Sequence, residues 1–109
     1  MAYDENLAQR IRQLLSGQPG RTEKKMFGGL SFMLQGNMAC GVLRDDMIVR
    51  IDPVQHDAVT AQPHIRTFDM TGRPMKGWIV VGPGAIASDA ELQEWVIKGV
   101  QYALSLPPK

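Results

Sequence analysis

A chain of 109 residues is long enough for one domain with a single hydrophobic core, and its ordinary apolar and charged fractions exclude a disordered chain. The net charge of +1 gives no strong attraction to nucleic acid or to an acidic membrane. A lone cysteine excludes an intramolecular disulfide, and every apolar run is far shorter than the roughly 20 residues that span a bilayer. Because the N-terminus carries no secretory-signal pattern, we expect a cytoplasmic protein with no membrane partner.

The N-terminal segment predicts an amphipathic helix. Apolar residues recur at helical spacing over residues 3–15. Asp4 and Glu5 place negative charge where a helix N-terminus favours it, and Gly17 is a plausible stop. A glycine- and proline-containing linker then follows at residues 17–20.

The next part of the chain predicts three short strands, at residues 30–34, 38–43 and 47–51. Gly36-Asn37 is a hairpin signal between the first two strands, and a polar turn at residues 44–46 joins the second to the third. Turns this short indicate an antiparallel meander.

A short helix and two more strands are expected after the meander. Asp52 followed by Pro53 is typical of an N-cap and a first helical residue, and the helix is expected to end near Ala61. Strands are predicted at residues 66–70 and 78–81, with a long turn-rich loop between them.

A final helix completes the predicted domain. Ser88 and Glu91 form a capping box, and apolar residues repeat at helical spacing beyond it. Gly99, on the buried face, is expected to allow close approach to the sheet. The prediction is one α+β domain over residues 1–109, with an antiparallel sheet, flanking helices, the order α-β-β-β-α-β-β-α, and a loose tail at residues 106–109.

Residues able to perform chemistry are few and isolated. Cys40 lies in mid-strand with no visible activating group, so a small buried residue is the better interpretation. His56 and His64 lack the companions of a metal site and are interpreted as surface histidines. We therefore expect no catalytic residue, no metal and no cofactor, and do not expect an enzyme.

Basic, methionine and aromatic residues are the candidates for binding. The long loop at residues 71–78 is the main candidate, because long connections in small domains often carry binding. A solvated surface and methionines that fill the core are the plain alternatives. The partner-binding candidates are Lys24, Lys25, Arg50, Arg73, Pro74, Met75, Lys76 and Trp78.

Three motifs carry a family resemblance: KMFGG at residues 25–29, MACG at 38–41 and MTGRPMKGW at 70–78. Together they resemble the N-terminal domain of the TfoX/Sxy competence-regulator family. The resemblance implies helices packed on an antiparallel sheet and a regulatory role, with no catalytic or ligand residues to carry over. Full-length members are coactivators that work with the cyclic-AMP receptor protein and carry a second, helical C-terminal domain. This chain stops at Lys109, so we expect a stand-alone first domain.

Two functional hypotheses follow. The first is a non-catalytic regulatory domain that binds a protein, such as a component of the transcription machinery, through the 71–78 loop and the nearby basic residues. An exposed sheet edge could also mediate homodimerisation. The alternative is a small-molecule or nucleic-acid binding module that uses a groove beside the loop. Direct contact with nucleic acid stays open.

Overall fold

The computed structural model describes residues 3–26, 28–69 and 75–108. Within these residues the helices are α1 (Glu5–Leu14), α2 (His56–Thr60) and α3 (Asp89–Ser105), with short 3-10 turns η1 (Pro53–Gln55) and η2 (Pro83–Ala85). The strands are β1 (Arg21–Met26), β2 (Gly29–Leu34), β3 (Asn37–Leu43), β4 (Asp46–Arg50), β5 (Ile65–Thr67) and β6 (Trp78–Val81). None of the described helices is both long and apolar enough to cross a membrane.

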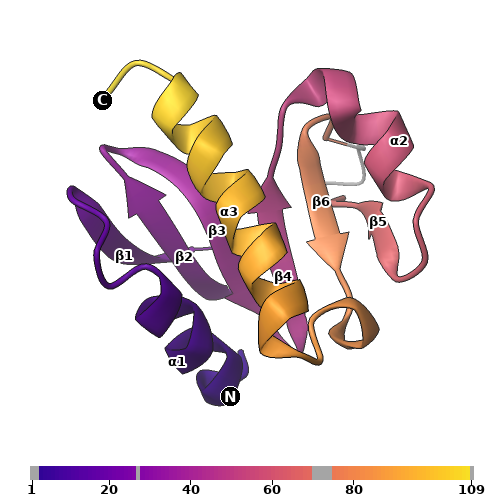
Figure 1. The fold of residues 1–109 in the computed structure, drawn as a ribbon, viewed down its shortest axis with the longest axis horizontal. Coiled ribbons are helices and arrows are strands. Elements are labelled where there is room, and N and C mark those ends of the chain that lie inside the picture. The colour runs from indigo at the N-terminus through magenta and orange to yellow at the C-terminus, as the bar shows by residue number, and fades with distance from the viewer. Residues whose placement is uncertain (1–2, 27, 70–74, 109) are drawn as a thin grey trace.

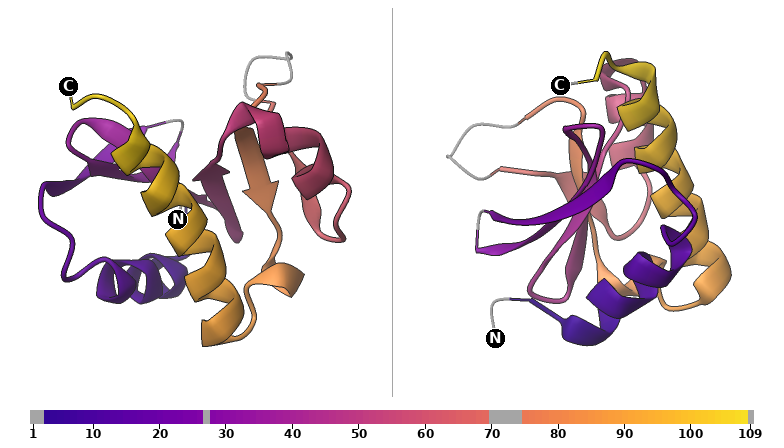
Figure 2. Two further views of the ribbon diagram at one scale, coloured as in Figure 1. Left: turned by 45° about the horizontal axis from the view of Figure 1, so that its top comes forward. Right: turned by 90° about the vertical axis from the view of Figure 1, so that its left-hand side faces the viewer.

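All six strands form one antiparallel sheet in the order β1-β2-β3-β4-β6-β5 (Figure 1). The first four strands are a meander, and the later hairpin β5–β6 adds to β4 through β6. Seen from the side, α1 and α3 lie against one face of the sheet (Figure 2). The predicted α+β class, the antiparallel sheet and the order of the expected elements are confirmed.

One strand, β1, is present where no strand is predicted. Its residues 21–25 are all exposed, so it has no alternation of buried and exposed side chains. Such an edge strand gives no periodic signal in the sequence. It is held instead by pairing along its whole length with β2, from Arg21 opposite Leu34 to Met26 opposite Gly29.

The main core lies between the helices and the inner face of the sheet. Alternate sheet residues such as Phe32, Val49 and Ile79 meet Ile11 of α1 and Leu92 of α3 there, all of them buried. The short α2 contributes to the same core. The three helices therefore share one face of a two-layer domain.

A bulge in β3 brings α3 unusually close to the sheet. The Cα partner of Phe32 is Cys40 and that of Met33 is Met38, so Ala39 is left without one. A Cβ atom placed on Gly99 would lie 2.3 Å from the carbonyl oxygen of Ala39. The predicted close approach at Gly99 is confirmed, and only glycine fits this contact.

The β2–β3 turn is shifted by one residue from the prediction of Gly36-Asn37. Its central residues are Gln35 and Gly36, with φ values of 53° and 85°, as a type I′ turn requires. Asn37 is instead the first residue of β3 and is buried. Its Nδ2 donates to the carbonyl oxygen of Pro107 at 2.9 Å, which ties this part of the C-terminal segment to the hairpin.

The predicted helix caps are present. The carboxylate of Asp52 accepts from the backbone N–H of Val54, and Pro53 opens η1 directly before α2. Ser88 and Glu91 form the expected capping box of α3. Because each of these caps satisfies backbone donors at a helix start, the sequence signals for them are reliable.

Candidate functional site

The second face of the sheet carries an apolar cluster of its own. Buried side chains of β3, β4, β6 and the segment after β5 meet there, with half-buried neighbours around them. We call this group the outer cluster: Met38, Ile48, Phe68 and Val80, bordered by Met33, Leu43, Met75 and Trp78. None of its members belongs to a described helix. The four central residues are at most 5% exposed, so the cluster is a second small core, and only its half-buried border is a candidate binding surface.

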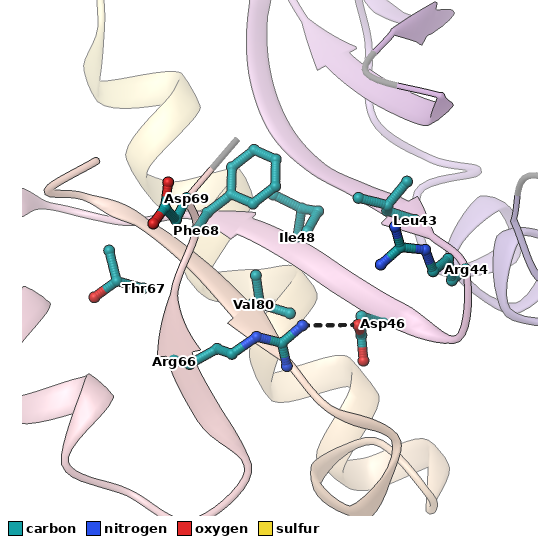
Figure 3. A pocket seen from close by; sticks show the side chains of 9 residues that line it. All are labelled: Leu43, Arg44, Asp46, Ile48, Arg66, Thr67, Phe68, Asp69 and Val80. Carbon is teal, nitrogen blue, oxygen red and sulfur yellow. Dashed lines mark hydrogen bonds and ion pairs between the residues drawn. The ribbon is translucent and has the colours of Figure 1, made fainter. Parts of the chain in front are cut away.

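A cavity of about 510 Å³ opens on this face (Figure 3). Its floor contains Ile48 of β4 and Val80 of β6, which are direct register partners. We call this cavity the outer groove, and its lining is Leu43, Arg44, Asp46, Ile48, Arg66, Thr67, Phe68, Asp69 and Val80. The volume falls within the usual range for ligand pockets.

The rim of the outer groove is polar. Arg66 Nη2 and Asp46 Oδ2 form an ion pair at 3.1 Å. Arg44, at the β3–β4 turn, and Asp69, just after β5, form no ion pair with any described residue. Figure 3 shows these two charges at opposite ends of the groove, with Phe68 between them.

Next to the outer groove, an arginine is stacked between two aromatic rings. The Arg50 guanidinium carbon is 5.1 Å from the ring centroid of Trp78 and 5.4 Å from that of Tyr102. Arg50 and Trp78 are register partners on β4 and β6. Trp78 also approaches Phe68, with ring centroids 6.5 Å apart. The stacking fixes a cation beside the outer cluster.

The comparison with known families agrees with this architecture. The profile of the TfoX N-terminal domain matches residues 13–103, which is most of the chain and includes the whole sheet. The chain belongs to the TfoX N-terminal domain family. No curated protein matches it.

In this TfoX N-terminal domain the predicted binding residues do not form one site. Lys24 and Lys25 are exposed on β1, and their register partners, Ser31 and Leu30, place them on opposite faces of the sheet. Three inter-strand spacings, about 14 Å, separate β1 from β4, where Arg50 lies. These two lysines are therefore not part of the site near the outer groove.

The remaining candidates cluster beside Arg50 as far as the structure describes them. Met75 packs on the outer cluster, and its backbone accepts from the N–H of Trp78 at 3.0 Å and donates to the carbonyl of Phe68 at 3.2 Å. Lys76 is exposed next to it. Arg73 and Pro74 lie outside the described residues, as does the first half of the predicted 71–78 loop, residues 71–74.

The prediction that both histidines are at the surface is wrong for His56. Its side chain is buried, because α2 packs it against β5 and the start of β6. The Gly77 N–H donates to His56 Nδ1 at 2.9 Å. Since Nδ1 accepts, Nε2 carries the proton and donates to Thr67 Oγ1 at 2.9 Å. His56 thus holds together both ends of the β5–β6 connection, whereas His64 is exposed.

Cys40 occupies the buried position that its strand context predicts. It is in the main core with no exposed surface, and burial raises the pKa of its thiol to about 12. A thiol that stays protonated is a poor nucleophile. Within residues 3–26, 28–69 and 75–108, no group of three or more histidine, cysteine or acidic residues is placed to hold a metal ion.

Sequence reasoning predicts a groove beside the 71–78 loop but identifies none of the residues that line the outer groove, and it misses Tyr102. Tyr102 is far from Arg50 in the chain, and only the packing of α3 on the sheet brings the two together. The sequence does indicate the position of Ile48. It lies between the core residues Met47 and Val49, so strand alternation places it on the other face of the sheet. The residues from Arg66 to Asp69 gave no such signal, because β5 is too short to show a period.

Proposed function

We propose that this domain is a non-catalytic regulatory module that binds another protein through the outer face of its sheet. The observation that supports it is the half-buried apolar border of the outer cluster, to which the described helices contribute nothing and which lies beside a groove with a polar rim. Aromatic, methionine and arginine side chains, which are enriched in protein interfaces, gather there as Trp78, Met75 and Arg50.

Two observations favour binding over catalysis. Both ring nitrogens of His56 are used in holding the fold, so this imidazole has no free position for general-base chemistry. The Cys40 thiol is buried and protonated. Neither group reaches the outer groove, whose lining contains no histidine or cysteine.

Family membership makes a protein of the transcription machinery the proposed partner class. Direct contact with nucleic acid is less well supported, because Lys24 and Lys25 are on β1, three strands away from Arg50 on β4. Homodimerisation through β1 is also less favourable. That edge carries four charged residues between positions 21 and 25, and edge charges oppose strand-to-strand pairing.

The test is affinity capture with matched variants. We expect the wild-type domain to retain a set of proteins from a lysate of the organism that encodes it. The paired substitution Met75→Glu with Lys76→Glu should remove that set, because it places two carboxylates beside the outer cluster.

The control carries the same chemical changes on the helical face. It pairs Ile97→Glu with Lys98→Glu on α3, where Ile97 is 44% exposed. This variant should retain the wild-type set. Thermal unfolding of all three proteins checks that each is folded. An identical set of retained proteins for all three would rule out the proposed function.

Small-molecule binding is the second candidate, and the volume of the outer groove favours it. In that case a library of small carboxylate and amine compounds should raise the unfolding temperature of the wild type. The same compounds should not raise the unfolding temperature of a folded Ile48→Asp variant, because a carboxylate then replaces the apolar side chain at the floor of the groove. An unchanged unfolding temperature across the library removes this candidate.

A further inference from the structure

We propose that β1 is a docking edge, to which an extended acidic segment of another protein adds as one further strand of the sheet. The inference goes beyond the proposed function, because it concerns the edge of the sheet and not its outer face. It also gives a role to Lys24 and Lys25, which the site near the outer groove leaves unused. It is carried by the backbone of β1, by its exposure and by its charge.

The backbone of β1 has one side without partners. β1 is an outermost strand of the sheet, and among the described strands it pairs with β2 alone (Figure 1). The Gln35 N–H donates to the carbonyl oxygen of Gly20 at 3.0 Å, so alternate residues from Gly20 onward turn their backbone groups toward β2. Arg21, Glu23 and Lys25 therefore turn their N–H and carbonyl groups to the free edge. No described residue hydrogen-bonds to these three donors and three acceptors.

The free edge of β1 is open to solvent along its length, since residues 21–25 are all exposed. The other edge of the sheet, β5, is only three residues long, and α2 packs against it. Strand addition needs a row of main-chain groups that a partner can reach, and β1 supplies the longer row. β1 is therefore the edge to which a strand can add.

The charge of this edge is positive. Arg12 of α1 engages both carboxylate oxygens of Glu23, at 2.6 Å and 2.8 Å, and neutralises this residue. Lys24 and Lys25 form no ion pair with any described residue. The Arg21 guanidinium donates to a backbone carbonyl at 3.0 Å, which leaves its charge in place. Three cations thus remain beside the unpaired backbone groups, and a segment that carries carboxylates complements them.

The positions of the two lysines define the segment. Lys25 is opposite the core residue Leu30 and Lys24 is opposite Ser31, so the two lysines belong to opposite faces of the sheet. Consecutive residues of an added strand also alternate between the two faces. Two adjacent acidic residues therefore place one carboxylate on each face. The expected ligand is an extended segment with adjacent acidic residues and with free backbone N–H groups.

Two other occupants complement this edge less well. A second copy of β1 would bring its own unneutralised lysines against these, so the charges that oppose self-pairing favour an acidic strand instead. A nucleic-acid backbone offers phosphate acceptors to the lysines. It has no row of donors for the outward carbonyl groups of β1, so only half of the edge would be used.

The experiment titrates three hexapeptides with blocked ends into the isotope-labelled domain and follows binding by NMR. Glu-Glu-Thr-Val-Glu-Glu carries both features of the expected ligand. Glu-Glu-Pro-Pro-Glu-Glu keeps the charge but loses two adjacent backbone donors, and Lys-Lys-Thr-Val-Lys-Lys reverses the charge. We expect the first peptide to bind at least roughly threefold more tightly than the second, as the loss of one or two hydrogen bonds allows, and the third not to bind measurably.

Amide exchange distinguishes strand addition from the attraction of charges alone. With saturating Glu-Glu-Thr-Val-Glu-Glu, exchange of the Arg21, Glu23 and Lys25 amide protons should slow by at least roughly threefold, because these N–H groups gain acceptors. Exchange of the Thr22 and Lys24 amide protons should change less, since these N–H groups already face β2.

Matched variants test whether the interaction belongs to this edge. Lys24→Glu and Lys25→Glu, tested singly, should each weaken binding of the acidic peptide about two- to fivefold, as exposed ion pairs allow. Lys98→Glu, on α3, makes the same change of charge and should bind the peptide as the wild type does. Thermal unfolding checks that each variant is folded.

Three results would each overturn the proposal: no binding of the acidic peptide, equal affinity for its proline analogue, or unchanged exchange of the three outward amide protons. An equal loss of affinity in Lys98→Glu and Lys24→Glu would also overturn it, because the attraction would then belong to the molecule as a whole. None of these results bears on the capture experiment, whose variants lie at Met75 and Lys76.

Discussion

At the scale of single residues, the buried His56 joins the two strands beside which the candidate site lies. His56 is the shared partner of Thr67, at the end of β5, and of Gly77, just before β6. The described ends of the connection between these strands lie at the outer cluster, since Phe68 belongs to it and Met75 packs against it. A side chain in the helical layer therefore fixes the geometry of the opposite face.

We expect His56→Asn to lower the free energy of unfolding by about 1–3 kcal/mol, because the shorter side chain leaves the buried Gly77 N–H without its acceptor. The matched variant His64→Asn should change it by less than about 0.5 kcal/mol, since His64 is exposed and asparagine tolerates its φ of 68°. Urea unfolding measures both. Equal losses in the two variants would contradict the structural role of His56.

At the scale of elements, the contact between α3 and the bulge of β3 fixes how the helical layer sits on the sheet. The Ala39 carbonyl and Gly99 leave no room for a methyl group. Helix propensity alone would favour alanine at position 99 by about 1 kcal/mol. The backbone contact opposes this preference.

Gly99→Ala should therefore destabilise the domain by about 1–3 kcal/mol, as overpacking against rigid backbone does. Gly17→Ala is the matched control, because a Cβ there would meet no atom within 4 Å. It should be neutral or slightly stabilising. Thermal unfolding compares the two. A Gly99→Ala protein as stable as the wild type would show that the helix can move away from the sheet without cost.

At the scale of the whole molecule, the edge strand β1 is attached to the helical layer by an ion pair. Arg12 of α1 donates to the carboxylate of Glu23 through Nε at 2.6 Å and Nη2 at 2.8 Å. The hydrogen bond from Arg12 lowers the pKa of the Glu23 carboxyl, while partial burial opposes that shift. The folded protein therefore binds the proton at Glu23 less readily than the unfolded chain does.

Stability from this pair is fully present above the unfolded pKa of about 4.3 and is lost as the pH falls through the lower folded value. Both side chains are 34% exposed, so Glu23→Gln should cost less than about 1 kcal/mol near pH 7. The cost should be smaller at pH 3 than at pH 7. Urea unfolding of the variant and the wild type at both pH values measures it. A cost that is independent of pH would mean that the carboxylate charge does not contribute.

Much of this fold could be predicted from the sequence, and the exceptions have physical causes. The capped α3, the strands on either side of the β3–β4 turn and the close approach at Gly99 each depend on local pattern, and each is present. The sequence predicts the turn at Gly36-Asn37, one residue later than the observed Gln35-Gly36, because Asn37 is also a good turn residue. Asn37 is instead a buried donor to Pro107, and no local pattern indicates such a long-range contact.

The candidate site was less predictable than the fold. Arg50 and Trp78 were identified because strand alternation indicates which residues share a face. Lys24 and Lys25 were grouped with them on charge alone, and the strand order separates them. The outer groove combines residues from β3 to β5, so it required the pairing of β4 with β6, which no local pattern specifies.

The burial of Cys40 has a practical consequence for coupling chemistry. A protonated thiol inside the core does not react with alkylating reagents while the domain is folded, so Cys40 need not be replaced before labelling. A cysteine introduced at Ile97, on the exposed side of α3, becomes the single reactive handle. Attachment of a dye or a solid support there presents every molecule in one orientation, with the opposite face of the sheet toward the solution.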